Sequence, residues 1–99
     1  MKIRASPHFQ QRINLREIPE GLGETILRNA DGHYQNGVTG YLIAVRRVSF
    51  QGKDRDMALT YEHGDDEITL VTLHPLKDGQ KDNRIASRRW VPYEPESKL

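Results

Sequence analysis

Residues 40–75 read GYLIAVRRVSFQGKDRDMALTYEHGDDEITLVTLHP, and apolar side chains alternate with polar ones through much of this stretch. A period of two is typical of β-strands, since successive side chains point to opposite faces of a sheet. The pattern predicts strands at 40–50, 56–62 and 68–74, separated by turns at 51–54 and 64–66. Strands joined by such short turns pair antiparallel, so we expect a meander.

The segments on either side complete the expected fold. A short strand at 33–35 precedes the meander and ends in the Asn36-Gly37 turn. Two helices come before it, one opened by Ser6-Pro7 and one running from Pro19 to Asn29. We therefore expect an α+β fold with two N-terminal helices packed on a four-stranded antiparallel meander sheet, followed by an irregular C-terminal segment.

The composition indicates a single domain over residues 1–99, with loosely ordered ends at 1–5 and 92–99. The absence of cysteine excludes disulfides and the common cysteine-based zinc sites. No run approaches the roughly 20 apolar residues of a membrane span, and the N-terminus lacks the apolar core of a signal peptide. We therefore expect a cytoplasmic location and no membrane contact.

Charge is distributed unevenly, although the formal net charge is only +1. Residues 1–16 carry four basic side chains and no acid, whereas residues 54–67 carry six acids and one arginine. The chain as a whole therefore has no strong electrostatic signature of nucleic-acid binding, and any basic surface must be local.

A local basic cluster lies at residues 83–90, NRIASRRW, which contain three arginines and the only tryptophan. Guanidinium groups bind phosphate in a bidentate manner. The Trp90 ring either packs as an anchor on the sheet or stacks on a base, and packing is the more frequent outcome.

Several motifs together resemble the small RelE-like families, which belong with the barnase–colicin–RelE fold of metal-independent ribonucleases and toxins. They are Ser6-Pro7-His8 with Arg12, residues 68–75 (ITLVTLHP), and Asn83-Arg84-Ile85 continuing to Arg89-Trp90. The resemblance spans roughly residues 6 to 91. It implies an RNA-binding protein, a possible toxin-type endoribonuclease, and an acidic antitoxin protein that covers the basic face.

Cleavage of RNA without a metal needs a base, an acid, and a cation that balances the charge on phosphorus. His74 is the first candidate for the base or acid, and His8 is the second. Arg84 is the candidate that binds the scissile phosphate. The sequence shows no metal-ligand spacing and no phosphate-binding glycine loop, so we expect no metal and no other cofactor.

Further basic side chains are candidates for RNA binding: Arg12, Arg46, Arg47, Lys81, Arg88 and Arg89. Two alternatives remain for these residues. The arginines of 84–89 can instead pair with Asp78, Asp82 or Glu94 as ordinary surface charges. Arg46-Arg47 interrupts an apolar strand and can also protect a sheet edge from aggregation.

The same residues are compatible with two other functions. One is a non-catalytic protein-interaction domain, and the other is a module that binds structured nucleic acid without cleaving it. An RNA assay in the presence of a metal chelator separates them from the ribonuclease.

Overall fold

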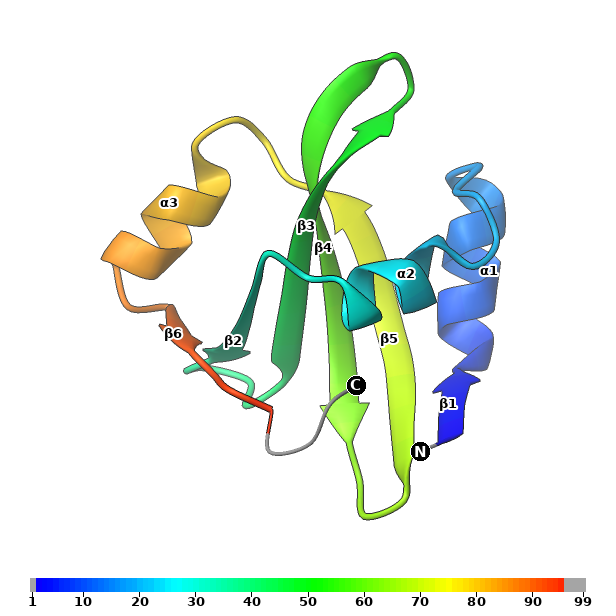
Figure 1. Cartoon of the computed structure of the whole chain (residues 1–99), viewed down its shortest axis with the longest axis horizontal. Helices are drawn as coiled ribbons and strands as arrows, with labels where there is room; N and C mark the ends of the chain where they lie inside the picture. Colours follow the sequence, from blue (N-terminus) through cyan, green and yellow to red (C-terminus); the bar gives the residue numbers. More distant parts are fainter. Residues whose placement is uncertain (1, 96–99) are drawn as a thin grey trace.

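The computed structural model describes residues 2–95, which form three helices and one six-stranded mixed sheet (Figure 1). The strands lie in the order β1-β5-β4-β3-β2-β6. Within these residues, no helix has the length and apolar character needed to cross a membrane. The elements in chain order are β1 (Lys2–Ala5), α1 (Pro7–Leu15), α2 (Leu22–Arg28), β2 (Gly32–Asn36), β3 (Leu42–Phe50), β4 (Lys53–His63), β5 (Glu67–Pro75), α3 (Gln80–Ala86) and β6 (Trp90–Pro92).

The expected four-stranded, two-helix architecture is wrong, because the sheet has two more strands and the chain has a third helix. The strands β2 to β5 pair antiparallel in chain order. β1 then adds to β5 in parallel, and β6 adds to β2. The sheet is therefore mixed and extends beyond the meander at both edges.

The three additional elements are short and have weak sequence patterns. β1 is largely exposed and is held by its parallel pairing with β5, from Lys2 opposite Glu67 to Ala5 opposite Leu70. β6 has three residues and ends in Pro92, which an edge strand tolerates. α3 has no buried residue and hence no apolar stripe to detect.

The structure describes the N-terminal end of the chain from residue 2 and the C-terminal end as far as residue 95. Residues 2–5, expected to be loosely ordered, form β1. At the other end, Pro92 belongs to β6, whereas residues 96–99 of the expected irregular segment lie outside the described residues.

α1 begins where its sequence predicts. Ser6 is the N-cap, and its hydroxyl oxygen accepts a hydrogen bond from Phe9 N–H at 3.0 Å. Phe9 and Ile13 face the sheet and are buried. α2 begins at Leu22 rather than at Pro19, because Gly21 has a left-handed conformation with a φ of 86° and ends the preceding loop.

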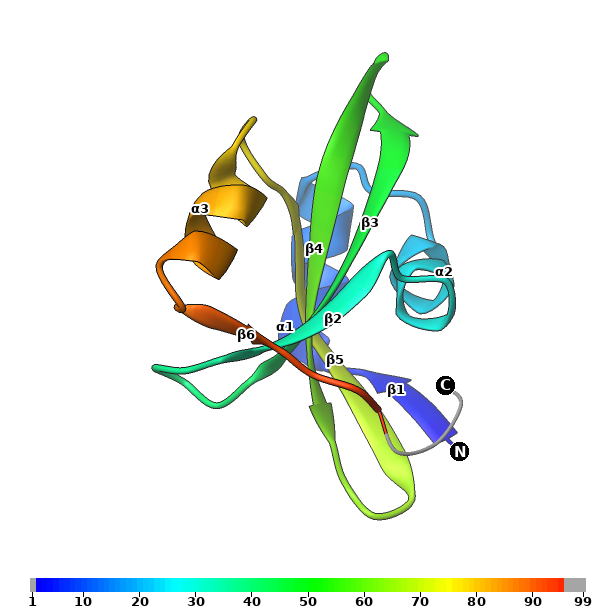
Figure 2. The ribbon, with the colours of Figure 1, turned by 60° about the vertical axis from the view of Figure 1, so that its left-hand side comes forward.

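The sheet has two different faces. α1 and α2 cover one face, where the main core contains residues such as Ile26, Leu59 and Leu73. α3 lies on the opposite side of the sheet from α2 (Figure 2). On that side a smaller apolar cluster surrounds Trp90 and Ile43. The residues of interest for function lie beside this smaller cluster.

Candidate functional site

A cavity of about 270 Å³ lies on the α3 side of the sheet and has His74 and Arg84 in its wall. His74 comes from the end of β5, and Arg84 comes from α3. Ile43, Thr60 and Thr72 from the central strands complete much of the wall, together with Trp90 and with Tyr41, which directly precedes β3. Two of the three predicted catalytic residues therefore share one cavity.

A β-bulge in β5 shapes the wall of this cavity. Thr72 pairs with Thr60, whereas Leu70 pairs with Tyr61, so Val71 has no partner residue on β4. A bulge of this kind turns two successive side chains toward one face. Val71 and Thr72 accordingly both line the cavity, and the register beyond them presents His74 to the same side.

The imidazole of His74 is half-buried between two positive charges. Burial lowers the pKa of His74 below its usual value of 6.5, and the charges of Arg16 and Arg84 lower it further. The ring is therefore neutral at neutral pH, which is the form that accepts a proton.

Arg84 is held by an aromatic contact. Its guanidinium carbon lies 5.4 Å from the centroid of the Trp90 ring, within the range of a cation–π interaction. Trp90 in turn stacks on Tyr34, with ring centroids 5.8 Å apart and planes inclined by 27°. The guanidinium therefore has a supported position in the cavity wall.

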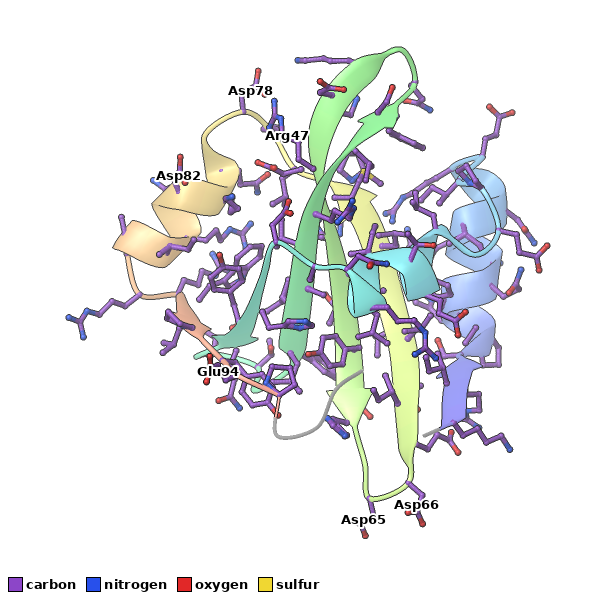
Figure 3. All side chains as sticks on the ribbon, in the orientation of Figure 1. Arg47, Asp65, Asp66, Asp78, Asp82 and Glu94 are labelled. Atoms are coloured by element: carbon purple, nitrogen blue, oxygen red, sulfur yellow. The ribbon has the colours of Figure 1, made fainter. Side chains whose placement is uncertain are left out.

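The acids that the sequence offered as alternative partners do not pair with Arg84. Asp78 pairs with Lys53 at 3.4 Å, and none of the ion pairs found within residues 2–95 involves Asp82 or Glu94. Figure 3 shows Asp82 on α3 and Glu94 beyond β6. No described carboxylate thus neutralises Arg84 through an ion pair.

Trp90 is the anchor that its sequence favoured, since it is only 3% exposed. Its indole Nε1–H is buried and has no hydrogen-bond partner among the described residues. An unpaired buried donor costs about 1–3 kcal/mol.

Arg16 does not line the cavity, but its charge acts on His74, and the sequence analysis did not select it. It is the C-cap residue of α1, and its Nη1 donates a hydrogen bond to the Leu73 carbonyl at 2.9 Å. Leu73 lies beyond Leu70, the last residue of β5 that pairs with β1. Arg16 thus bonds to a β5 carbonyl that β1 does not reach, in the residue directly before His74. Its i+4 spacing from Arg12, one helical turn further along the chain, was the available signal.

The other predicted site residues do not line this cavity. His8 and Arg12 are exposed on α1. Arg46 points to the helix-covered face, where it donates to the Asn29 carbonyl, and Arg47 pairs with Asp56 at 3.3 Å. The remaining three, Lys81, Arg88 and Arg89, belong to α3 and the turn that follows it.

A partly buried pair of a histidine and a tyrosine lies elsewhere in the sheet. His33 Nδ1 and the Tyr61 hydroxyl are 2.8 Å apart. Burial lowers the pKa of His33, and burial together with Tyr93 raises the pKa of Tyr61 well above its usual value. Tyr61 therefore keeps its proton. The two residues lie far apart in the chain, and no sequence signal connects them.

No group of three or more His, Cys, Asp or Glu side chains within residues 2–95 is arranged to hold a metal ion. Comparison of the chain with protein-family models, with curated proteins and with solved structures gave no match.

Proposed function

We propose that the protein binds RNA at the cavity between His74 and Arg84 and cleaves it as an endoribonuclease that needs no metal. The observation that supports this most is that a neutral histidine and an unneutralised arginine line one cavity. RNA transesterification uses a base that removes a proton and a cation that stabilises the charge developing on the phosphate.

The chemistry assigns one role to each side chain. His74 takes the proton of the ribose 2′-OH, and the 2′-oxygen attacks phosphorus. The bond from phosphorus to the 5′-oxygen breaks, which leaves a 2′,3′-cyclic phosphate and a new 5′-hydroxyl that takes its proton from water. Arg84 binds the non-bridging phosphate oxygens, where negative charge develops.

The predicted second histidine has no part in this proposal, because His8 does not line the cavity. Arg16 acts through position, since it holds the end of β5 at Leu73. The antitoxin protein and the cytoplasmic location stay predictions. An acidic segment lying over Arg84 would block the cavity and inhibit cleavage.

The test is cleavage of a labelled single-stranded RNA in EDTA. We expect cleavage by the unmodified protein, a rate about 100-fold lower for Arg84→Ala, and a loss of about 100-fold or more for His74→Gln. The products should carry a 2′,3′-cyclic phosphate. DNA of the same sequence should stay intact, because it has no 2′-OH.

Arg28→Ala is the matched control, since Arg28 is an arginine of α2 that pairs with Glu24 and lies outside the cavity. Its rate should equal that of the unmodified protein. Equal rates for Arg84→Ala and the unmodified protein would refute the role of Arg84. RNA binding can be measured by the fluorescence of Trp90. If the RNA binds but is not cleaved, the catalytic part of the proposal is refuted.

A further inference from the structure

The cavity that holds His74 and Arg84 has more room than a phosphate group fills. Its volume of about 270 Å³ equals that of about nine water molecules in the liquid. Part of its wall is a row of three residues on neighbouring strands, since Thr72 pairs with Thr60 and Thr60 pairs with Ile43. His74 is two residues beyond Thr72 on β5, so about 7 Å separate their Cα atoms. The row therefore adjoins the catalytic base.

The chemistry of this row suits a neutral ligand rather than a second phosphate. Ile43 is apolar and only 2% exposed. Thr60 and Thr72 are partly buried, and each hydroxyl can both donate and accept a hydrogen bond. None of the three side chains is charged. An apolar surface with a few hydrogen-bonding groups is typical of sites for small planar ligands.

Tyr41 lies beside this row and lines the same cavity. It directly precedes Leu42, which faces the main core, so its side chain and that of Ile43 share the α3 side of the sheet. The Tyr41 carbonyl accepts a hydrogen bond from Asn36 N–H at 2.9 Å, and Tyr41 N–H donates to the Thr39 hydroxyl oxygen at 3.2 Å. The backbone of Tyr41 is therefore fixed, while its side chain is 38% exposed. A fixed and accessible aromatic ring is a platform for stacking.

We propose that this part of the cavity binds the base of the nucleotide whose 2′-oxygen attacks the phosphate at Arg84, with the base stacked on Tyr41 and its edge at Thr60. The inference rests on the proposed function and specifies its substrate. The base is attached to the ribose carbon next to the one that carries the 2′-OH, so a 2′-OH at His74 brings its own base into the same cavity.

The site specifies an unpaired base rather than one particular base. Every base has a face that can stack on an aromatic ring. A threonine hydroxyl donates as well as accepts, so it can bind either a carbonyl or an amino group on the edge of a base. A base held in this way is no longer paired or stacked in a duplex. The substrate is therefore single-stranded RNA of varied sequence.

The test uses two probes that need no cleavage. One is a dinucleoside monophosphate whose first sugar is 2′-deoxyribose, which prevents cleavage, and the other lacks the first base but is otherwise identical. Since each probe has a single phosphate, the position of the base relative to Arg84 is defined. In titrations followed by NMR, the complete probe should shift the backbone amides of Thr60 and Thr72. It should bind about tenfold more tightly than the probe without the base.

Variants of Tyr41 assign the interaction to its ring. Tyr41→Ala should weaken binding of the complete probe about tenfold and leave binding of the probe without the base unchanged, because the contact requires both partners. Tyr41→Phe should retain the binding, since the ring face remains. Val38→Ala is the control, because Val38 is an exposed residue of the same turn that does not line the cavity.

A hairpin RNA tests the same inference during cleavage. Its loop offers unpaired bases, whereas its stem holds every base in a pair. Cleavage should therefore occur in the loop and not in the stem. Equal cleavage in loop and stem would contradict the base site.

The inference is overturned if neither probe shifts the amides of the cavity, or if the two probes bind equally. Either result alongside Arg84-dependent RNA cleavage would refute the base site and leave the proposed function standing. Base-dependent binding that Tyr41→Ala abolishes, without any RNA cleavage, would support the base site and refute the catalytic proposal.

Discussion

Burial and two nearby positive charges determine the protonation of His74. Burial disfavours the imidazolium form most, and the positive charges act in the same direction. Arg16 and Arg84 supply those charges from two different helices. The residue is therefore prepared to act as a base rather than as an acid.

We expect the pKa of His74 to lie below 6.5, and Arg16→Gln to raise it because one of the two positive charges is removed. Cleavage should therefore decline as the pH falls through the pKa of His74, and in Arg16→Gln this decline should begin at a higher pH. NMR titration of the His74 ring measures the pKa, and a pH profile of kcat/KM measures the decline. Arg28→Gln serves as the control, and an unchanged His74 pKa in Arg16→Gln would contradict the argument.

The same shift makes stability depend on pH. The unfolded state binds a proton at the usual histidine pKa near 6.5, whereas the folded state binds it only at a lower pH. This contribution to the free energy of unfolding is complete when the pH lies above the unfolded-state pKa of about 6.5. It is lost as the pH falls through the lower pKa of the folded state. The pKa of His33 is lowered as well. The free energy of unfolding of the double variant His33→Gln/His74→Gln should therefore depend less on pH than that of the unmodified protein or of either single variant.

At the scale of elements, the contact between α1 and α2 depends on a glycine. A Cβ added at Gly23 would lie 2.9 Å from Phe9 Cζ and 3.4 Å from Leu70 Cδ1. Phe9 is a buried ring packed on the sheet and cannot move away easily. The absence of a side chain at Gly23 therefore allows α2 to approach α1.

Gly23→Ala should consequently destabilise the protein by about 1–3 kcal/mol through overpacking. An alanine in place of glycine in an exposed helix would instead stabilise it by about 1 kcal/mol. Chemical denaturation measures the difference. Thr25→Ala, at an exposed position of α2, should leave the stability nearly unchanged. A Gly23→Ala variant as stable as the unmodified protein would contradict the packing argument.

On the scale of the whole molecule, the separation of charges limits how RNA can bind. The net charge is only +1, and acidic residues gather around the turn between β4 and β5, where Figure 3 labels Asp65 and Asp66. If the protein binds RNA as proposed, we therefore expect the phosphate contacts near Arg84 rather than over a broad basic surface.

We expect RNA binding to depend weakly on salt. One or two phosphate contacts predict a slope of log K against log salt between about −0.7 and −1.4 for a single strand. Fluorescence titrations with an uncleavable 2′-O-methyl RNA at several KCl concentrations measure the slope. Arg84→Ala should reduce its magnitude by about 0.7. A slope of about −2.8 or steeper would indicate that Lys81, Arg88 and Arg89 bind the strand together with Arg84.

Local pattern was sufficient for the four strands of the meander and for the two N-terminal helices. Alternating apolar residues in 40–75 and the Ser6-Pro7 helix start act within a few residues of each other, so they can be recognised along the chain. The sequence analysis assigned His74 and Arg84 to one reaction and favoured an anchoring role for Trp90, but it also grouped His8 with them, and His8 does not line their cavity.

The edge strands, the third helix and the surroundings of His74 depend on contacts between residues that are distant in the chain. β1 and β6 exist because β5 and β2 offer edges to which they can bond, and α3 has no apolar stripe of its own. The bond from Arg16 to the Leu73 carbonyl and the position of Arg84 over Trp90 arise only when separate elements pack together. The sequence therefore specifies the central elements, and the packing of those elements creates the cavity, because burial and charge at His74 depend on neighbours remote in the chain.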